Sequence, residues 1–315
     1  MEKSRNRETG NGEILSKDTK REETRSHKVW RRFRKHPGAV AGSILLTFLM
    51  IAVIVAPLSP YDPETSNVTE NFQSPSWQHP MGTDALGRDM LTRVLYGGRI
   101  SLTVGLMVVA ITLTLGVSVG AVAGYLGGTV DNILMRITDS ALTLPSLLVL
   151  ILLSAILREV DLPIFSKSSV LTIAVIIGLL SWMTFARLVR ATILTLRELD
   201  FVTASRSLGA SDVRIIIKHI LPNAIGPIIV EATLELGYAI IEESGLSFLG
   251  FGIQPPTPSW GNLLSNAQEN FVKYPWLAIF PGLMIFITII SVNYIGDGLR
   301  DALDPYKVLG KIGET

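Results

Sequence analysis

Apolar residues gather into long runs that alternate with polar segments along the whole chain. The runs occupy residues 39–58, 101–122, 141–157, 169–185, 225–241 and 276–295. A helix needs roughly 20 mostly apolar residues to cross a bilayer, within a range of about 17–25. Each run reaches this length once the usual boundary error of about two to four residues is allowed. The pattern therefore predicts an all-α integral membrane protein with six transmembrane helices.

The composition agrees with a membrane protein. Hydrophobic residues make up 48% of the 315 residues and charged residues only 17%, whereas about 25% of an average soluble domain is charged. No cysteine occurs, and this excludes disulfide bonds and thiolate metal sites. The lipid bilayer is therefore the first partner that the sequence predicts.

Lysine and arginine are distributed unevenly between the two sides that six spans would create. With residue 1 in the cytoplasm, the cytoplasmic segments hold 22 of the 28 basic residues and the opposite segments hold 6. Basic residues are enriched in the cytoplasmic loops of membrane proteins. Both termini and the polar segment 199–223 are therefore predicted to face the cytoplasm.

The segments outside the spans suggest a division of the chain. Residues 1–27 are charged and lack apolar periodicity, which predicts a disordered cytoplasmic tail. Residues 28–38 are basic and place Trp30 and Phe33 on one helix face, as a helix on the inner leaflet would, although the charges alone also serve to set the topology. There follow a first span at 39–58, an extracytoplasmic loop at 59–98, five further spans within 99–296, and a cytoplasmic tail at 297–315.

Local signals predict further helix boundaries. Residues 89–96 can form one amphipathic helix inside the outer loop. The glycine pair at 127–128 breaks a helix after the second span, and Asp131, which shares a helix face with Asp139, can start the next helix. Pro145 falls one to two turns into the third span, where a kink is tolerated if neighbours or water satisfy the freed carbonyl.

A polar segment rich in small residues, 199–223, separates the fourth and fifth apolar runs. Asp200 is expected to cap a short helix, and Gly209 to end that helix in a left-handed conformation. Ser211 or Asp212 is expected to cap a second helix that runs toward the next span. The segment is therefore predicted to fold into two short helices at the cytoplasmic surface.

The first of these short helices exposes small side chains. They belong to Ala204, Ser205, Ser207 and Gly209, and they let another backbone approach closely. Such a surface suits docking to a partner better than it suits a chemical reaction, although an ordinary connecting loop has a similar composition.

The same segment resembles the EAA loop in permeases of ATP-binding-cassette importers. That motif consists of Glu-Ala-Ala, three residues, Gly, nine residues, Ile, any residue and Leu-Pro. Ala204, Gly209 and the closing Leu-Pro pair match it, whereas Thr203, Ser205 and His219 stand in the positions of Glu, Ala and Ile. The resemblance implies a cytoplasmic coupling helix that contacts an ATPase through Thr203, Ala204, Ser205, Gly209, Ala210, Ser211, Leu221 and Pro222.

Three more blocks resemble the second permease subunit of dipeptide, oligopeptide and nickel importers. They are G-T-D-x-L-G-R-D at 82–89, L-S-F-L-G-F-G-I-Q-P-P-x-P-x-W-G at 246–261 and G-D-G-L-R-D-x-L-D-P at 296–305. The resemblance implies the type I importer permease fold with six spans, in a bacterial or archaeal cell membrane. It also implies a related second permease subunit, two ATP-binding-cassette ATPase subunits and an extracytoplasmic solute-binding protein as partners.

Motifs for bond-making chemistry and for nucleotide binding are missing from the sequence. No G-x-x-x-x-G-K-[ST] phosphate loop occurs, so the energy of ATP has to come from a partner. The histidines are scattered, which argues against a metal centre. Ser247 lacks both the spacing of a nucleophile elbow and a nearby histidine. The sequence therefore predicts no catalytic residue, no cofactor, no metal site and no nucleic-acid partner.

Three glutamates of the fifth apolar run share one helix face. At 100° per residue, Glu235 and Glu242 project about 40° and about 20° from Glu231. An ionised carboxylate that faces lipid costs about 2.5–3.5 kcal/mol. The stripe is therefore expected to face the bundle interior and to line a translocation path, where it would favour a cationic or amine-bearing solute.

Other arrangements would also satisfy these carboxylates. They could pair with Arg187, with Arg190 or with a partner permease, or they could be protonated. Glu243 projects about 120° from Glu231 and so lies outside the stripe.

The leading functional hypothesis is a permease that forms half of a pore. It would convert closure of the ATPase into a switch between inward-open and outward-open states. The alternatives are an ion-coupled carrier or channel that uses the glutamates, and a membrane-embedded enzyme. The solute stays open among dipeptides, oligopeptides, nickel or a metal chelate, and other small molecules.

Overall fold

The described part of the protein is built almost entirely from helices. The computed structural model describes residues 25–159 and 169–303, so most of the predicted tail at 1–27 and the end of the predicted tail at 297–315 lie outside the described residues. Within these two ranges, the β structure is limited to an isolated bridge between Thr83 and Asp89. The prediction of an all-α protein is confirmed.

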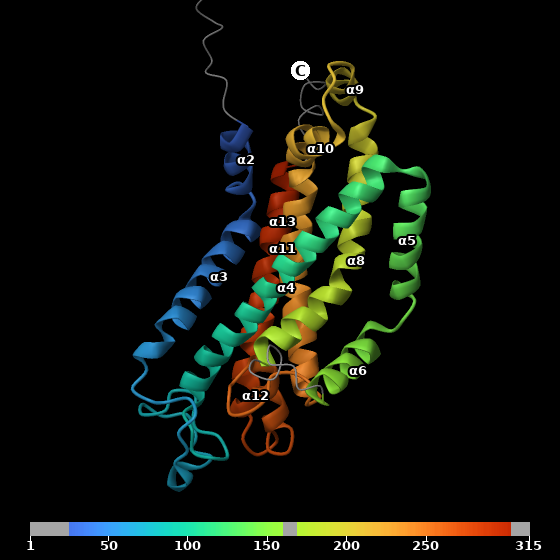
Figure 1. Cartoon of the computed structure of the whole chain (residues 1–315). Helices are drawn as coiled ribbons and strands as arrows, with labels where there is room; N and C mark the ends of the chain where they lie inside the picture. The colour runs from blue at the N-terminus through green and yellow to red at the C-terminus, as the bar shows by residue number, and fades with distance from the viewer. Residues whose placement is uncertain (1–24, 160–168, 304–315) are drawn as a thin grey trace, which may run out of the picture.

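Figure 1 labels the helices in their order along the chain. They are α2 (Arg25–Phe33), α3 (Pro37–Val55), α4 (Met90–Leu126), α5 (Gly128–Leu142), α6 (Ser146–Glu159), α8 (Ser169–Arg197), α9 (Asp200–Ser207), α10 (Asp212–Ile215), α11 (Leu221–Phe248), α12 (Trp260–Ala267) and α13 (Trp276–Leu303). Two 3₁₀ turns, η1 (Ala56–Leu58) and η2 (Val68–Glu70), and a π turn, η3 (Ile216–Ile220), complete the described elements. In the described ranges, 5 helical stretches are long and apolar enough to cross a membrane, and a sixth span results if α5 and α6 count as one.

The third span differs from the single kinked helix predicted over 141–157. α5 ends at Leu142 and α6 begins at Ser146, and the two helices are bent by 86° at this break. Pro145 has no backbone N–H, and its ring disfavours a helical conformation at the preceding residue. The apolar run therefore supplies only the second half of a broken span, whose first half is α5.

α4 begins earlier than predicted. Residues 89–96, predicted as a separate helix in the outer loop, contribute the N-cap and first turns of α4. Asp89 is the N-cap, and its carboxylate accepts a 2.7 Å hydrogen bond from the backbone N–H of Thr92. The missing side chain of Gly98 leaves room for Val53 and for the ring of Trp260 to pack against this part of α4. The predicted outer loop therefore ends at Asp89.

Glycines spaced four residues apart bring α4 and α8 into close contact. A Cβ atom built on Gly120 would lie only 2.5 Å from the carbonyl oxygen of Ala186, and Gly116 and Gly124 leave similarly little room. Small residues at this spacing let two membrane helices approach closely. α4 and α8 therefore form one tightly packed pair at the centre of the bundle.

The described elements that connect the spans gather at two opposite ends of the bundle (Figure 1). α2, α9 and α10 lie at one end, where Phe33 of α2 packs against Ala302 near the end of α13. The loop that follows α3 and the short helix α12 lie at the other end. Segments that are predicted to face the same side of the membrane thus lie at the same end.

Candidate functional site

The polar segment between α8 and α11 begins with the short helix α9. Leu199 is the N-cap of α9, no side chain caps the helix, and Asp200 is its first helical residue. The predicted cap by Asp200 is therefore wrong. The fully buried Val202 explains this register, because its side chain packs in the same core cluster as Ile193 of α8. Tertiary packing has overridden the local capping preference.

α9 and α10 both contact the end of α4 through one tyrosine. Ser211 is the N-cap of α10, but its side chain makes no capping bond. Asp212 accepts a 2.7 Å hydrogen bond from the hydroxyl of Tyr125 instead of capping the helix. Nη2 of Arg206 donates a 3.3 Å bond to the same hydroxyl, and this bond raises the pKa of Arg206 above its ordinary value. The two short helices are therefore tied to a spanning helix.

α10 widens into the π turn η3 before α11 begins. The backbone N–H of Leu221 bonds to the carbonyl oxygen of Ile216, five residues earlier. Pro222 cannot donate the next helical bond because it has no backbone N–H. π turns are rare and occur frequently at functional sites. The second helix predicted to run toward Ile220 is therefore present as α10 and η3, not as one regular helix.

The outward face of α9 carries small side chains, and two of their hydroxyls already have hydrogen-bond partners. Thr203, Ala204 and Ser207 are exposed, and the hydroxyls of Ser205 and Ser207 bond to carbonyl oxygens of the helix itself. Leu208, which follows the helix, is 89% exposed. A face of this kind is suited to contact with another protein, because little polar surface has to be desolvated there.

Gly209 adopts the left-handed conformation that the sequence predicts. Its φ is +78°, and no atom lies within 4 Å of the position that a Cβ would take. The backbone conformation, not crowding, therefore requires glycine here. Among the other predicted contact residues, Ser211 and Pro222 are exposed, and Ala210 and Leu221 are half-buried.

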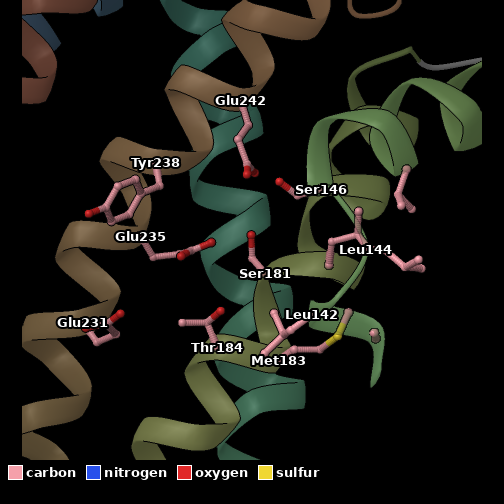
Figure 2. Close-up of a pocket in the computed structure, with 13 residues that line it drawn as sticks. Leu142, Leu144, Ser146, Ser181, Met183, Thr184, Glu231, Glu235, Tyr238 and Glu242 are labelled. Atoms are coloured by element: carbon pink, nitrogen blue, oxygen red, sulfur yellow. The ribbon is translucent and has the colours of Figure 1, made fainter. Parts of the chain in front are cut away.

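A cavity of about 350 Å³ lies at the break between α5 and α6. Figure 2 shows that α11, α8 and the broken span each contribute side chains to it. The labelled residues are Leu142, Leu144, Ser146, Ser181, Met183, Thr184, Glu231, Glu235, Tyr238 and Glu242. The three glutamates of the predicted stripe therefore face one cavity inside the bundle.

Glu235 and Glu243 occupy different surroundings although both are buried. Glu235 points across the cavity toward Ser181 (Figure 2) and is 9% exposed, and its Oε1 atom has no hydrogen-bond partner. Glu243 lies outside the cavity, where it accepts hydrogen bonds of 2.8 Å from Ser101 and 2.7 Å from Ser247. The angular separation predicted from the sequence is thus present in the structure.

The two arginines that could have neutralised the stripe have other partners. Arg190 of α8 donates two hydrogen bonds to Asp131 of α5, and the distance between Nη2 and Oδ2 is 2.6 Å. Nε of Arg187 lies 3.7 Å from Oδ1 of Asp139, which follows Asp131 on the same face of α5 about two helical turns later. These ion pairs join α8 to α5, on the N-terminal side of the α5–α6 break. They also leave the stripe without an arginine partner among the described residues.

Tyr125 and Arg190 were not predicted as site residues. A charged side chain inside a spanning helix is costly unless it is paired, so Arg190 alone indicates that an acidic partner exists. The sequence does not show which aspartate that partner is. No local signal indicates the role of Tyr125, because its partners come from two later elements.

Two family descriptions match the chain. "Binding-protein-dependent transport system inner membrane component" matches residues 116–307, more than half of the chain. The chain belongs to this family. "N-terminal TM domain of oligopeptide transport permease C" matches residues 24–75. The two matches include the basic helix α2 at one end of the chain and α13 at the other, and leave residues 76–115 between them.

Known proteins are similar to this chain over most of its length. The glutathione transport system permease protein GsiD of Escherichia coli is 41% identical over 281 residues, which are 89% of this chain and 90% of the relative. A "Putative peptide permease protein" of Brucella suis biovar 1 is 42% identical over 277 residues, covering 87% of this chain and 89% of the relative. A solved chain of the MetNI methionine ABC transporter, in an inward-facing conformation, has a TM-score of 0.56 at 17% identity and covers 68% of this chain and 98% of that chain. The last likeness concerns the fold alone.

Membership of this family decides between the functional hypotheses. The protein is a permease of an ATP-driven importer and crosses the bacterial inner membrane several times, and the type I importer fold is confirmed. The family implies an ATPase and a binding protein as partners. The alternative of an ion-coupled carrier or channel is not supported, and the relatives are named as transport permeases.

Proposed function

We propose that this permease forms half of the translocation path for a peptide or a related small organic solute. Its relatives are named for glutathione and peptide transport. The observation that carries the proposal is the cavity at the α5–α6 break, which Glu231, Glu235 and Glu242 line from a spanning helix. Ionisable residues inside a membrane bundle typically mark the path of a solute or an ion.

An organic solute fits the cavity better than nickel does. Within the two described ranges, no group of three or more His, Cys, Asp or Glu residues is placed to hold a metal ion. Glu231 and Glu242 are separated by about 16 Å along α11, because each residue of a helix rises by 1.5 Å. The stripe is therefore spread along a path and does not converge on one ion.

The complete importer would contain a second, related permease, two ATPase subunits and an extracytoplasmic binding protein. The second permease would close the open side of the cavity and supply the other half of the path. The excess of basic residues supports a cytoplasmic location for both termini and for the end of the bundle that carries α9. The ATPase subunits would then have direct access to α9.

An ATPase that contacts Ala204 and Gly209 would act on the cavity through packed side chains. Val202 and Ile215 anchor the segment in the bundle core, where both are fully buried. Tyr125 joins the segment to α4, which packs tightly against α8. Since α8 forms one wall of the cavity, a displacement of α9 would reach the solute path without passing through a flexible loop.

Purification and reconstitution test this proposal. The permease should co-purify with one related permease and two ATPase subunits. Proteoliposomes that contain this complex should take up dialanine or glutathione only with internal ATP and external loaded binding protein. A permease that purifies without an ATPase, or that moves these solutes down an ion gradient, would contradict the proposal.

A further inference from the structure

We infer that the cavity at the α5–α6 break is an ammonium-binding site that recognises the free amino group of the solute. The inference rests on the proposed function, and it names the part of the solute that this chain contacts. It follows from the charge of the cavity, from one unsatisfied buried oxygen atom, and from the polar groups around that atom.

The cavity lining is strongly unbalanced in charge. It contains three carboxylates and, among the described residues, no lysine, arginine or histidine. The arginines closest along α8 are already paired, Arg190 with Asp131 and Arg187 with Asp139. Carboxylates in a low-dielectric environment need a cationic partner or a set of donors. A cation that enters with the solute would supply the partner that the described residues do not provide.

Glu235 marks the position of that cation. Its side chain is 9% exposed, and its Oε1 atom has no hydrogen-bond partner. Nearly all buried polar atoms in proteins have such a partner. Among the described residues no donor reaches Oε1, so this oxygen can accept a hydrogen bond from a bound solute. Figure 2 shows the carboxylate directed into the cavity, toward Ser181 of α8. A donor bound between α11 and α8 would satisfy it.

The groups around Glu235 fit an ammonium group. An ammonium carries three N–H donors and no acceptor, so it needs several oxygen atoms in different directions. The hydroxyls of Ser181 and Thr184 on α8 and of Ser146 on α6 line the same cavity as the glutamates. Leu142 and Leu144 also line the cavity, where they can contact the apolar portion of a solute.

The size of the cavity limits what it can hold. A volume of about 350 Å³ is near the lower end of the range of about 300–1,000 Å³ that is typical of small-molecule sites. Such a cavity accommodates one end of a peptide, not a whole oligopeptide. Recognition of the amino terminus by this chain, with the remainder of the solute against the second permease, agrees with that size.

Charge-selective labelling of an introduced cysteine tests the inference directly. The natural chain has no cysteine, so Ser181→Cys places its single thiol in the cavity. In the purified complete importer, the rates of modification by a cationic aminoethyl and an anionic sulfonatoethyl methanethiosulfonate are measured from the mass of this chain. Relative to Ser74→Cys on an exposed loop, the cavity thiol should prefer the cationic reagent by at least about tenfold, because charged clefts concentrate counter-ions by this order.

Matched variants on the Ser181→Cys background identify the responsible carboxylate. Glu235→Gln should reduce the cation preference several-fold, whereas Glu235→Asp, which keeps the charge, should retain it. Glu243→Gln should leave the preference unchanged, since Glu243 faces Ser101 and Ser247 outside the cavity. Dialanine should slow the cationic reaction, and N-acetyldialanine, which lacks the ammonium, should not.

The outcomes separate this inference from the proposed function. Equal rates for the two reagents, or a preference that Glu235→Gln leaves intact, would overturn the ammonium site even if the importer takes up peptides. Failure of both reagents to react, in the nucleotide-free and the ATP-bound complex alike, would also overturn it, because a solute site has to open to water. A clear cation preference in a complex that takes up no peptide would support the site and refute the peptide-import function.

Discussion

The hydroxyl of Tyr125 at the end of α4 donates a 2.7 Å hydrogen bond to the carboxylate of Asp212, the first residue of α10. The two residues are 87 positions apart in the chain. Arg206 of α9 lies over the same tyrosine ring, with 5.8 Å between its Cζ atom and the ring centroid. One side chain therefore joins a spanning helix to both short helices that we propose to contact the ATPase.

Tyr125→Phe should weaken coupling without preventing membrane insertion. The substitution keeps the ring beneath Arg206 and removes only the hydroxyl, whose bond to Asp212 contributes about 1 kcal/mol or somewhat more. We expect loaded binding protein to stimulate ATP hydrolysis less, and uptake to fall, in reconstituted complexes. Tyr294→Phe, on an exposed tyrosine, is the control and should change neither rate. Normal stimulation in Tyr125→Phe would show that this bond has no part in coupling.

Gly209→Val should abolish uptake while the protein remains in the membrane. A residue with a Cβ at a φ of +78° costs about 1 kcal/mol or more, and valine also adds bulk at the proposed docking face. Gly209→Ala has a smaller backbone cost and less bulk than the β-branched valine, so it should retain more activity. Ala204→Asp should resemble Gly209→Val, because it places an unpaired charge in the contact. Uptake and ATPase stimulation are the measurements, and normal values in all three variants would mean that the segment is only a connecting loop.

Glu235→Gln should change transport more than Glu243→Gln does. The first variant removes a charge that faces the cavity, whereas the second removes one that lies among serine hydroxyls. Loss of a charged hydrogen bond of about 1.5–3 kcal/mol corresponds to at least about a tenfold change in solute affinity. Concentration-dependent uptake by proteoliposomes measures the difference. Equal and negligible effects of both variants would remove the role of the stripe in lining the path.

The ion pair between Asp131 and Arg190 should stabilise the protein more than the neighbouring pair does. Asp131→Asn should lower the free energy of unfolding by about 1–3 kcal/mol, because it breaks a bidentate, part-buried interaction. Asp139→Asn breaks a pair whose side chains are 57% and 60% exposed, and it should have an effect of about 0–1 kcal/mol. Thermal inactivation of the purified complex provides the comparison. An equal loss of stability in both variants would mean that the Asp131–Arg190 pair contributes no more than the more exposed one.

Cysteine labelling in intact cells should establish the orientation of the chain. Single cysteines at Ser76 and Asn266, both exposed, should react with a membrane-impermeant thiol reagent added outside. A cysteine at Ser211 should react only after the membrane is permeabilised, because the excess of basic residues predicts a cytoplasmic location for this end. Permeabilised cells provide the control for reactivity at each site. Reaction of Ser211→Cys in sealed cells would reverse the proposed orientation.

Structural features that depend only on residues close together in the chain could be predicted from the sequence. Five of the apolar runs coincide with long helices, because hydropathy over about 20 residues decides whether a helix can cross a membrane. The conformation of Gly209 followed from the residue type itself, since glycine alone enters the left-handed region without a Cβ penalty. The common face of Glu231, Glu235 and Glu242 followed from helical geometry, which sets their angular positions once the helix exists.

Features that depend on distant segments were decided only by the tertiary structure. Asp200 does not cap α9 because the burial of Val202 sets the start of that helix. Pro145 indicated a kink, but the 86° bend depends on the packing of α5 and α6 against the rest of the bundle, in which the bond from Arg190 to Asp131 spans 59 positions. Composition and periodicity thus determined that this chain crosses the membrane and carries a carboxylate stripe. Long-range packing determined which cavity the stripe faces and which spanning helix the segment 199–223 contacts, because these contacts exist only after the chain has folded.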